Sequence, residues 1–118
     1  LARTRAFVFD AYGTLFDVHS AVGRHAAAVG PDAARLSEIW RSKQLEYSWV
    51  LSLMGRYEPF WTLTERALDY ALARCPGVER AVKPALLDAY RTLDCYPEVP
   101  AALGRLRQGG FRTGVLSN

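Results

Sequence analysis

The chain has 118 residues, of which 50% are apolar, and carries a formal net charge of +3. This length and composition suit one modest folded domain and argue against disorder. The arginines are spread along the chain, without the basic block that is typical of nucleic-acid-binding proteins. No apolar run reaches the about 20 residues that cross a bilayer, and the first residues lack the layout of a signal peptide. We therefore expect a soluble, cytoplasmic protein that binds neither nucleic acid nor membrane.

The cysteines and histidines suggest no metal site. Neither Cys75 nor Cys95 lies in a metal-binding spacing. Two reduced thiols are the usual state in a cytoplasmic protein, and the alternative is a disulfide between them. His19 and His25 have neither a partner acid nor a ligand spacing, so we expect both to be structural or surface residues.

The first predicted element is a short strand at 6–9, followed directly by the carboxylate of Asp10. An uncharged run of small, aromatic and β-branched residues is typical of a buried strand. Gly13 permits a tight turn, and Thr14 offers a hydroxyl beside the carboxylate. Open α/β sheets bind ligands beyond the carboxyl ends of their strands, so Asp10 is a candidate active-site residue. The alternative is a turn or helix cap, which these residue types commonly form.

Helical segments follow this strand, as apolar spacing and glycine or proline stops indicate. We expect helices at 18–29, 32–54, 59–74, 78–93 and 97–108. The second of these has so broad an apolar face that we expect burial on two sides. Gly109 and Gly110 end the last helix. A second strand at 111–116 then ends in Ser117 and Asn118, so polar groups again follow an apolar strand.

The order of elements predicts an α/β protein with a parallel-sheet core and an inserted helical subdomain. A crossover between parallel strands needs only about a dozen residues, far fewer than separate the two predicted strands. We therefore expect residues 1–17 and 94–118 to form the core and residues 18–93 to form a helical cap over Asp10. Two strands are too few for a parallel sheet covered on both faces. For this reason we expect the chain to be the first part of a larger protein.

Four segments, in order, carry a resemblance to one enzyme family. The segment FDAYGTLFDV at 9–18 resembles the nucleophile motif of the haloacid dehalogenase superfamily, and in particular that of the L-2-haloacid dehalogenases. Residues 40–49, 96–103 and 116–118 extend the resemblance over essentially the whole chain. The family implies a Rossmann-like core with a helical cap, a homodimer, and no metal or other cofactor.

The resemblance implies hydrolysis of L-2-haloalkanoic acids to 2-hydroxy acids. Asp10 would attack carbon 2 opposite the halide to form an ester with inversion, and water would then release the product. Tyr12 stands where superfamily phosphatases typically carry a second aspartate, which protonates the leaving oxygen of a phosphate ester. A halide needs no such proton, so Tyr12 favours dehalogenation. The alternatives are a phosphatase acting on a small ester and a catalytically silent dimeric relative.

The same resemblance assigns roles to polar side chains around Asp10. Arg41 matches the arginine that meets the substrate, and its planar fork would hold the carboxylate or receive the halide. The alternative is a surface arginine that pairs with an acid one turn earlier, Glu38. Hydroxyl and amide groups would hydrogen bond to the Asp10 carboxyl and the substrate, or else cap the turns that follow. These residues are Thr14, Ser117 and Asn118.

An apolar pocket around the alkyl group and the halide is the last predicted part of the site. Ordinary core packing is the alternative for each of its residues. They are Tyr12, Leu45, Phe60 and Trp61. The family's lysine and its later Asn and Asp residues would lie beyond Asn118, because Lys43 and Lys83 both belong to the expected cap. We therefore expect the 118-residue chain to be inactive by itself and the intact protein to be the enzyme.

Overall fold

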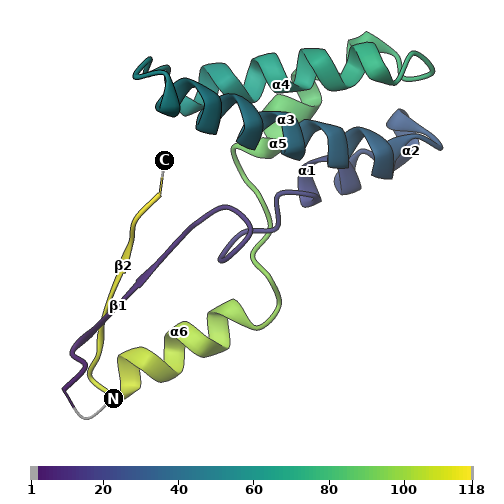
Figure 1. The fold of residues 1–118 in the computed structure, drawn as a ribbon. Coiled ribbons are helices and arrows are strands. Elements are labelled where there is room, and N and C mark those ends of the chain that lie inside the picture. Colours follow the sequence, from purple (N-terminus) through teal and green to yellow (C-terminus); the bar gives the residue numbers. More distant parts are fainter. Residues whose placement is uncertain (1–2, 118) are drawn as a thin grey trace. The chain divides into compact units, whose positions relative to one another are not determined.

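The computed structural model of the protein describes residues 3–117, which form two compact units. The sheet unit comprises the chain up to Val18 and again from Leu93, and the helical unit runs from His19 to Thr92. These boundaries differ by one residue from the core and cap segments expected from the sequence. Each unit has its own set of secondary-structure elements (Figure 1).

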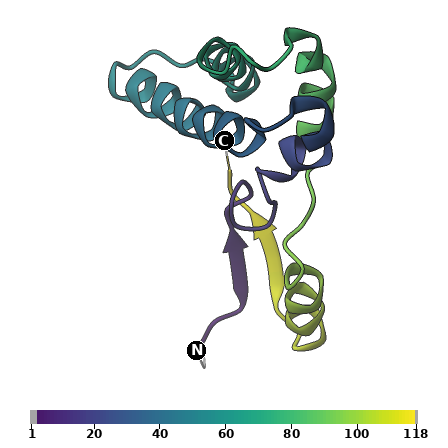
Figure 2. The ribbon, with the colours of Figure 1, turned by 90° about the vertical axis from the view of Figure 1, so that its right-hand side faces the viewer.

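The sheet unit is built on two parallel strands. Strand β1 (Ala6–Phe9) pairs with β2 (Arg112–Val115), and helix α6 (Val99–Gln108) precedes β2 and packs against it (Figure 2). The register places Phe9 opposite Val115, so both strands end at the same edge of the sheet. The parallel pairing of the first and last strands confirms the predicted α/β sheet.

Strand β1 is less buried than its apolar sequence predicts. Its side chains alternate between exposed and half-buried, and Val8 is 65% exposed. The half-buried Phe7 meets Phe111 edge-on, with 5.2 Å between the ring centroids. The prediction of a buried strand is therefore wrong for the face that carries Val8. A parallel strand is buried when helices cover both faces of its sheet, whereas α6 is the one α-helix among the described residues of the sheet unit.

Two segments of the sheet unit, 15–17 and 94–96, run antiparallel beside each other. The Asp17 N–H donates to the Asp94 carbonyl at 2.8 Å, and the Tyr96 N–H donates to the Leu15 carbonyl at 3.2 Å. These bonds satisfy backbone groups where the chain leaves and re-enters the sheet unit. They also tie the turn after β1 to the segment that leads into α6.

The helical unit contains five α-helices and one short 3-10 helix among its residues, all of them described. In chain order they are α1 (Ser20–Arg24), α2 (Ala26–Val29), α3 (Ala33–Leu53), α4 (Phe60–Arg74), η1 (Arg80–Val82) and α5 (Lys83–Tyr90). Helices α3 and α4 pack against each other, and α1 packs against both α3 and α5 (Figure 1). The core has Leu36, Leu68 and Leu86 among its largest fully buried side chains. The bounds of α3 and α4 confirm the two helices predicted at 32–54 and 59–74.

Two predicted helices are interrupted. The segment at 18–29 divides into α1 and α2 at His25, whose φ of −112° and ψ of 18° are not helical. The His25 N–H bonds to the carbonyl of Val22, three residues back, which tightens and ends the turn. The segment at 78–93 begins with η1, becomes α-helical at Lys83 and ends at Tyr90. Pro84 is tolerated in the first turn of α5, where a backbone N–H has no helical acceptor.

The apolar face of α3 is not buried on two sides along its full length. Trp49, Val50 and Leu53 are 63%, 48% and 89% exposed. The buried residues of α3, which include Leu36 and Trp40, all lie in its first twelve positions. The predicted two-sided burial is therefore wrong for the second half of α3. The apolar face there is broader than the area that the neighbouring helices cover.

Cys75 is buried, Cys95 is exposed, and both are free thiols. None of the described helices combines the length and the hydropathy that crossing a bilayer requires.

Candidate functional site

Asp10 lies one residue beyond β1, at the edge where β2 also ends. The Leu116 N–H donates to the Phe9 carbonyl at 2.8 Å, so backbone pairing continues one residue past β2. This pairing holds Ser117 next to Asp10. The Ser117 hydroxyl donates to Oδ1 of Asp10 at 3.5 Å, a long hydrogen bond. The predicted meeting of the two strand ends is therefore present in the sheet unit.

A tight turn brings a second hydroxyl to the same carboxylate. Oδ2 of Asp10 accepts a hydrogen bond from the Thr14 hydroxyl at 3.2 Å. The Ala11 carbonyl accepts the N–H groups of Thr14 at 3.3 Å and Leu15 at 2.9 Å, which closes the turn. Gly13 has a φ of 88°, a conformation that glycine adopts without strain. Each oxygen of Asp10 thus has a hydroxyl donor.

This arrangement suits a carboxylate that reacts with a small molecule. Asp10 is exposed, so its oxygens are accessible. Hydrogen bonds on both oxygens hold the carboxyl plane in one orientation, which reduces the freedom lost on reaching the transition state. Tyr12 is half-buried within the turn, where it forms an isolated β-bridge with Phe16.

Arg41 lies on α3 in the helical unit and is half-buried. Its Nη1 donates to Oε1 of Gln44 at 2.9 Å. Gln44 is 1% exposed, and its Nε2 donates to the hydroxyls of Thr64 at 2.8 Å and Tyr90 at 2.9 Å. The hydrogen bonds that connect Arg41 and Gln44 to their partners therefore involve three helices, α3, α4 and α5.

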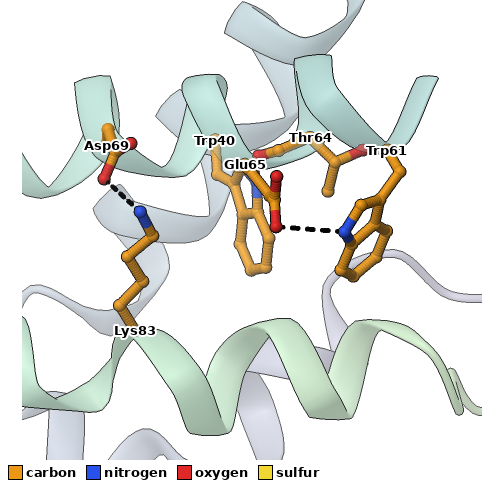
Figure 3. A network of polar contacts seen from close by, with 6 residues as sticks. All are labelled: Trp40, Trp61, Thr64, Glu65, Asp69 and Lys83. Atoms are coloured by element: carbon orange, nitrogen blue, oxygen red, sulfur yellow. Dashed lines mark hydrogen bonds and ion pairs between the residues drawn. The ribbon is translucent and has the colours of Figure 1, made fainter. Parts of the chain in front are cut away.

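Aromatic side chains surround these hydrogen bonds. The Trp40 Nε1 donates to the Thr64 carbonyl at 2.9 Å, and the Trp61 Nε1 donates to the Glu65 carboxylate at 3.0 Å. Both indole rings point toward α5 (Figure 3). The Tyr90 ring lies 5.2 Å from the Trp40 ring, centroid to centroid. Each indole N–H has an acceptor, which the buried Trp40 in particular requires.

The three pocket residues predicted from the helical unit are all half-buried. Leu45 lies on α3, and Phe60 and Trp61 open α4. The Arg91 guanidinium lies 4.3 Å from the Trp61 ring centroid, a cation–π contact within the helical unit. The Phe60 carbonyl accepts a hydrogen bond from the Thr64 hydroxyl at 2.9 Å. Phe60 therefore contacts one partner of Gln44, and the Trp61 ring lies 6.5 Å from the ring of the other, Tyr90, between centroids.

Both lysines of the chain are held in ion pairs on helices. The Lys83 Nζ lies 2.7 Å from the Asp69 carboxylate, as Figure 3 shows, and the Lys43 Nζ lies 2.7 Å from that of Glu46. The hydrogen bond to Glu46 raises the pKa of Lys43, because it stabilises the charged ammonium. A protonated, paired lysine is unsuited to act as a base.

Comparisons with known proteins identify the family. The profile of the haloacid dehalogenase-like hydrolases matches residues 4–118. The chain belongs to the haloacid dehalogenase-like hydrolases. This membership confirms the resemblance that the motifs at 9–18, 40–49 and 116–118 indicate.

Several curated members of the family share high sequence identity with the chain. It is 54% identical to (S)-2-haloacid dehalogenase 1 of Pseudomonas sp. (strain CBS-3) over 97% of its own length and 51% of that protein. It is 49% identical to (S)-2-haloacid dehalogenase 4A of Burkholderia cepacia, over 97% of its own length and 50% of that protein. The chain thus spans about half the length of these curated relatives.

Solved structures of dehalogenases share the fold. A dehalogenase solved with an intermediate complex superposes with a TM-score of 0.91 at 48% identity, over 98% of this chain and 51% of that one. The L-2-haloacid dehalogenase from Xanthobacter autotrophicus with covalently bound chloropropionic acid gives a TM-score of 0.82 at 37% identity, over 97% and 46%.

Two further residues singled out in the sequence are Asn118 and His19. Asn118 lies outside the described residues. His19 hydrogen bonds to the Ser37 hydroxyl at 2.7 Å within the helical unit, where it ties the start of α1 to α3. Within residues 3–117, no three His, Cys, Asp or Glu side chains cluster as a metal site requires.

Sequence reasoning missed Gln44, although this residue lies inside the motif at 40–49. A signal was present: Gln44 follows Trp40 by four positions and Arg41 by three, so it shares a helix face with both. A glutamine on the apolar face of a helix needs buried hydrogen-bond partners. Those partners, Thr64 and Tyr90, are distant in the sequence, which is why the pattern alone does not reveal them.

Proposed function

We propose that the intact protein hydrolyses the carbon–halogen bond of (S)-2-haloalkanoic acids and releases 2-hydroxy acids. The observation that carries the proposal is the exposed Asp10 carboxylate at the end of β1, with a hydroxyl donor on each oxygen. Family membership supports a hydrolytic reaction. Relatives 54% and 49% identical to the chain are named (S)-2-haloacid dehalogenases.

The first step is displacement of the halide by Asp10. A carboxylate oxygen attacks carbon 2 on the side opposite the halogen, the new carbon–oxygen bond forms, and the halide leaves with the electron pair of the broken bond. Carbon 2 is inverted, and Asp10 becomes an ester. This covalent step divides one difficult hydrolysis into two easier ones. The relative solved with covalently bound chloropropionic acid supports such an intermediate.

The second step is hydrolysis of that ester. Water attacks the aspartyl carbonyl carbon, the bond from this carbon to the substrate oxygen breaks, and one proton is released in total. The 2-hydroxy acid leaves and the Asp10 carboxylate is restored. Because the Thr14 and Ser117 hydroxyls already donate to the carboxyl oxygens, we propose that they also stabilise the charge that develops there.

We assign binding of the substrate anion to Arg41, on its match with the family motif. A guanidinium is planar and always charged, so it holds a carboxylate through two parallel hydrogen bonds or receives a departing halide. We assign the alkyl group and the halogen to apolar side chains, which bind such groups without displacing strongly held water. These side chains are Tyr12, Leu45, Phe60 and Trp61.

Tyr12 is the residue that weighs against phosphoryl transfer. It lies two positions after the proposed nucleophile, where a phosphatase needs an acid to protonate its leaving oxygen. A phenol in the ordinary pH range is a poor substitute for that acid. A halide leaves as an anion and needs no proton, so the tyrosine is compatible with dehalogenation.

Assembly and location are further parts of the proposal. We propose a homodimer, which the family resemblance implies and the exposed Trp49, Leu53 and Tyr57 near the end of α3 support. The two free thiols fit a reducing compartment such as the cytoplasm. Sedimentation of the intact protein at micromolar concentration should give the mass of a dimer, and a monomer would contradict this part.

Halide release is the decisive assay for the reaction. The intact protein should release chloride from (S)-2-chloropropionate equally well with and without EDTA, and it should leave the (R)-enantiomer intact. Phosphate release from small esters that depends on Mg²⁺ would favour the phosphatase alternative. Neither activity would favour a catalytically silent relative.

A further inference from the structure

We propose that Gln44 is a positioning residue for Arg41 and thereby sets the affinity for the anionic end of the substrate. Its effect on catalysis rests on the proposed function, whereas the contact itself does not. Arg41 Nη1 donates to Gln44 Oε1 at 2.9 Å, three positions along α3. The family resemblance assigns no role to this glutamine.

The orientation of the Gln44 amide is set by its other two partners. An amide group has two N–H donors and one carbonyl acceptor. The Nε2 donors reach the hydroxyl oxygens of Thr64 at 2.8 Å and Tyr90 at 2.9 Å. Oε1 also accepts a hydrogen bond from the Tyr90 hydroxyl at 3.2 Å. A flipped amide would point an N–H group at the Arg41 donor, and its oxygen would face Thr64, whose hydroxyl already donates to the Phe60 carbonyl. Oε1 is therefore held facing Arg41.

The partners of Gln44 are themselves held in place. Thr64 is 0% exposed, and its hydroxyl donates to the Phe60 carbonyl at 2.9 Å, which leaves its oxygen to accept from Gln44. Tyr90 is 6% exposed and packs against Trp40 at 5.2 Å. Because unpaired polar groups at such depth cost about 1–3 kcal/mol each, the network resists rearrangement.

The chemistry of the amide explains why a glutamine suits this position. A glutamate would also accept the Arg41 hydrogen bond, but its negative charge would offset the guanidinium charge that an anionic substrate needs. A neutral amide fixes the plane of the guanidinium and leaves its full positive charge. A guanidinium that is already held in one orientation also loses less rotational freedom on binding a carboxylate than a mobile one does.

Two substitutions at Gln44 separate its contributions. Gln44→Met keeps the size of the side chain and removes every hydrogen bond. Gln44→Glu keeps the acceptor for Arg41 and adds a charge. We expect Gln44→Met to raise the KM for (S)-2-chloropropionate by roughly tenfold, the equivalent of one lost hydrogen bond, with a smaller change in kcat. We expect Gln44→Glu to raise this KM as well, because its negative charge offsets that of the Arg41 guanidinium.

The matched control is Ser37→Ala. Ser37 is a buried residue of α3, and its hydroxyl hydrogen bonds to His19 at 2.7 Å, a contact that involves neither Gln44 nor its two hydroxyl partners. We expect Ser37→Ala to lower thermal stability but to leave KM within about twofold of the wild type. An equal rise of KM in Ser37→Ala and Gln44→Met would overturn the proposal, because core damage alone would then explain both.

A double-mutant cycle tests whether Gln44 acts through Arg41. In an Arg41→Ala background, Gln44→Met should change KM by less than about twofold, because the residue that Gln44 positions is absent. The same fold increase in both backgrounds would show that Gln44 acts independently of Arg41 and would overturn the proposal.

A spectroscopic measurement covers the cases in which activity is absent or Gln44→Met fails to fold. In ¹⁵N NMR spectra of the intact wild-type protein, the Arg41 Nη protons should give separate, slowly exchanging signals. These signals should merge in Gln44→Met, which removes the acceptor, and stay separate in Gln44→Glu, which keeps it. Averaged signals in the wild type would overturn the positioning role. Separate signals in a wild type that releases no halide would refute the proposed function and leave the contact established.

Discussion

The hydroxyl of Ser117 donates to Oδ1 of Asp10 although the two residues are 107 positions apart in the sequence. The parallel register of β1 and β2 produces this contact, because it ends both strands at one edge. Thr14 donates to the other oxygen, Oδ2, from the turn that follows β1.

Asp10→Asn should abolish halide release, with a loss on the order of 10³-fold or more, because an amide cannot form the ester. Asp88→Asn, which changes an exposed carboxylate of α5, is the matched control and should retain activity. A single turnover in H₂¹⁸O followed by peptide mass spectrometry should place the label in Asp10. Label that appears first in the hydroxyl of the product would instead indicate direct attack by water on carbon 2.

Thr14→Val should lower kcat by about tenfold, because it removes a hydroxyl that donates to a charged carboxylate. Ser117→Ala should have the smaller effect, since its hydrogen bond is longer, 3.5 Å against 3.2 Å. Thr14→Ser keeps the hydroxyl and serves as the control. Steady-state kinetics on (S)-2-chloropropionate measure all three, and a Thr14→Ser variant as slow as Thr14→Val would show that the methyl group, not the hydroxyl, matters.

Arg41→Ala should raise KM for the haloacid by about a hundredfold, the order expected when a charged hydrogen-bonded partner of an anion is lost. Arg41→Lys should recover only part of this loss, because an ammonium cannot form the bidentate contact. The midpoint of thermal unfolding should change little, in contrast to KM, since Arg41 is only half-buried. A variant that loses activity only because it unfolds would return Arg41 to a structural role.

Leu68→Ala should destabilise the helical unit by about 3 kcal/mol, because Leu68 is fully buried on α4 and its truncation leaves a cavity. Glu38→Ala, on α3, is the control. Glu38 is exposed, so its truncation should change the free energy of unfolding by less than about 0.5 kcal/mol. Urea denaturation followed by circular dichroism compares the two. A loss in Leu68→Ala no larger than that in Glu38→Ala would contradict the burial of Leu68.

Local sequence patterns were sufficient for most of the secondary structure. The apolar run before Asp10 and the apolar run before Ser117 predict β1 and β2, since strand formation depends on neighbouring side chains. The apolar spacing on α3 and α4 predicts both helices to within one residue. Burial was predicted less well, as Val8 and Trp49 show, because burial depends on what packs against a face and not on the face alone.

For the site, the sequence by itself determined which groups are available: a carboxylate after a strand, a hydroxyl in the following turn and a tyrosine in place of a second acid. Only the tertiary structure decided which of these meet. The parallel register brings Ser117 to Asp10. The packing of α3, α4 and α5 buries Gln44, which accepts a hydrogen bond from Arg41 and donates to Thr64 and Tyr90. Hydrogen bonds act over about 3 Å, whereas sequence patterns report neighbours along the chain, so partners from distant segments become visible only when the chain has folded.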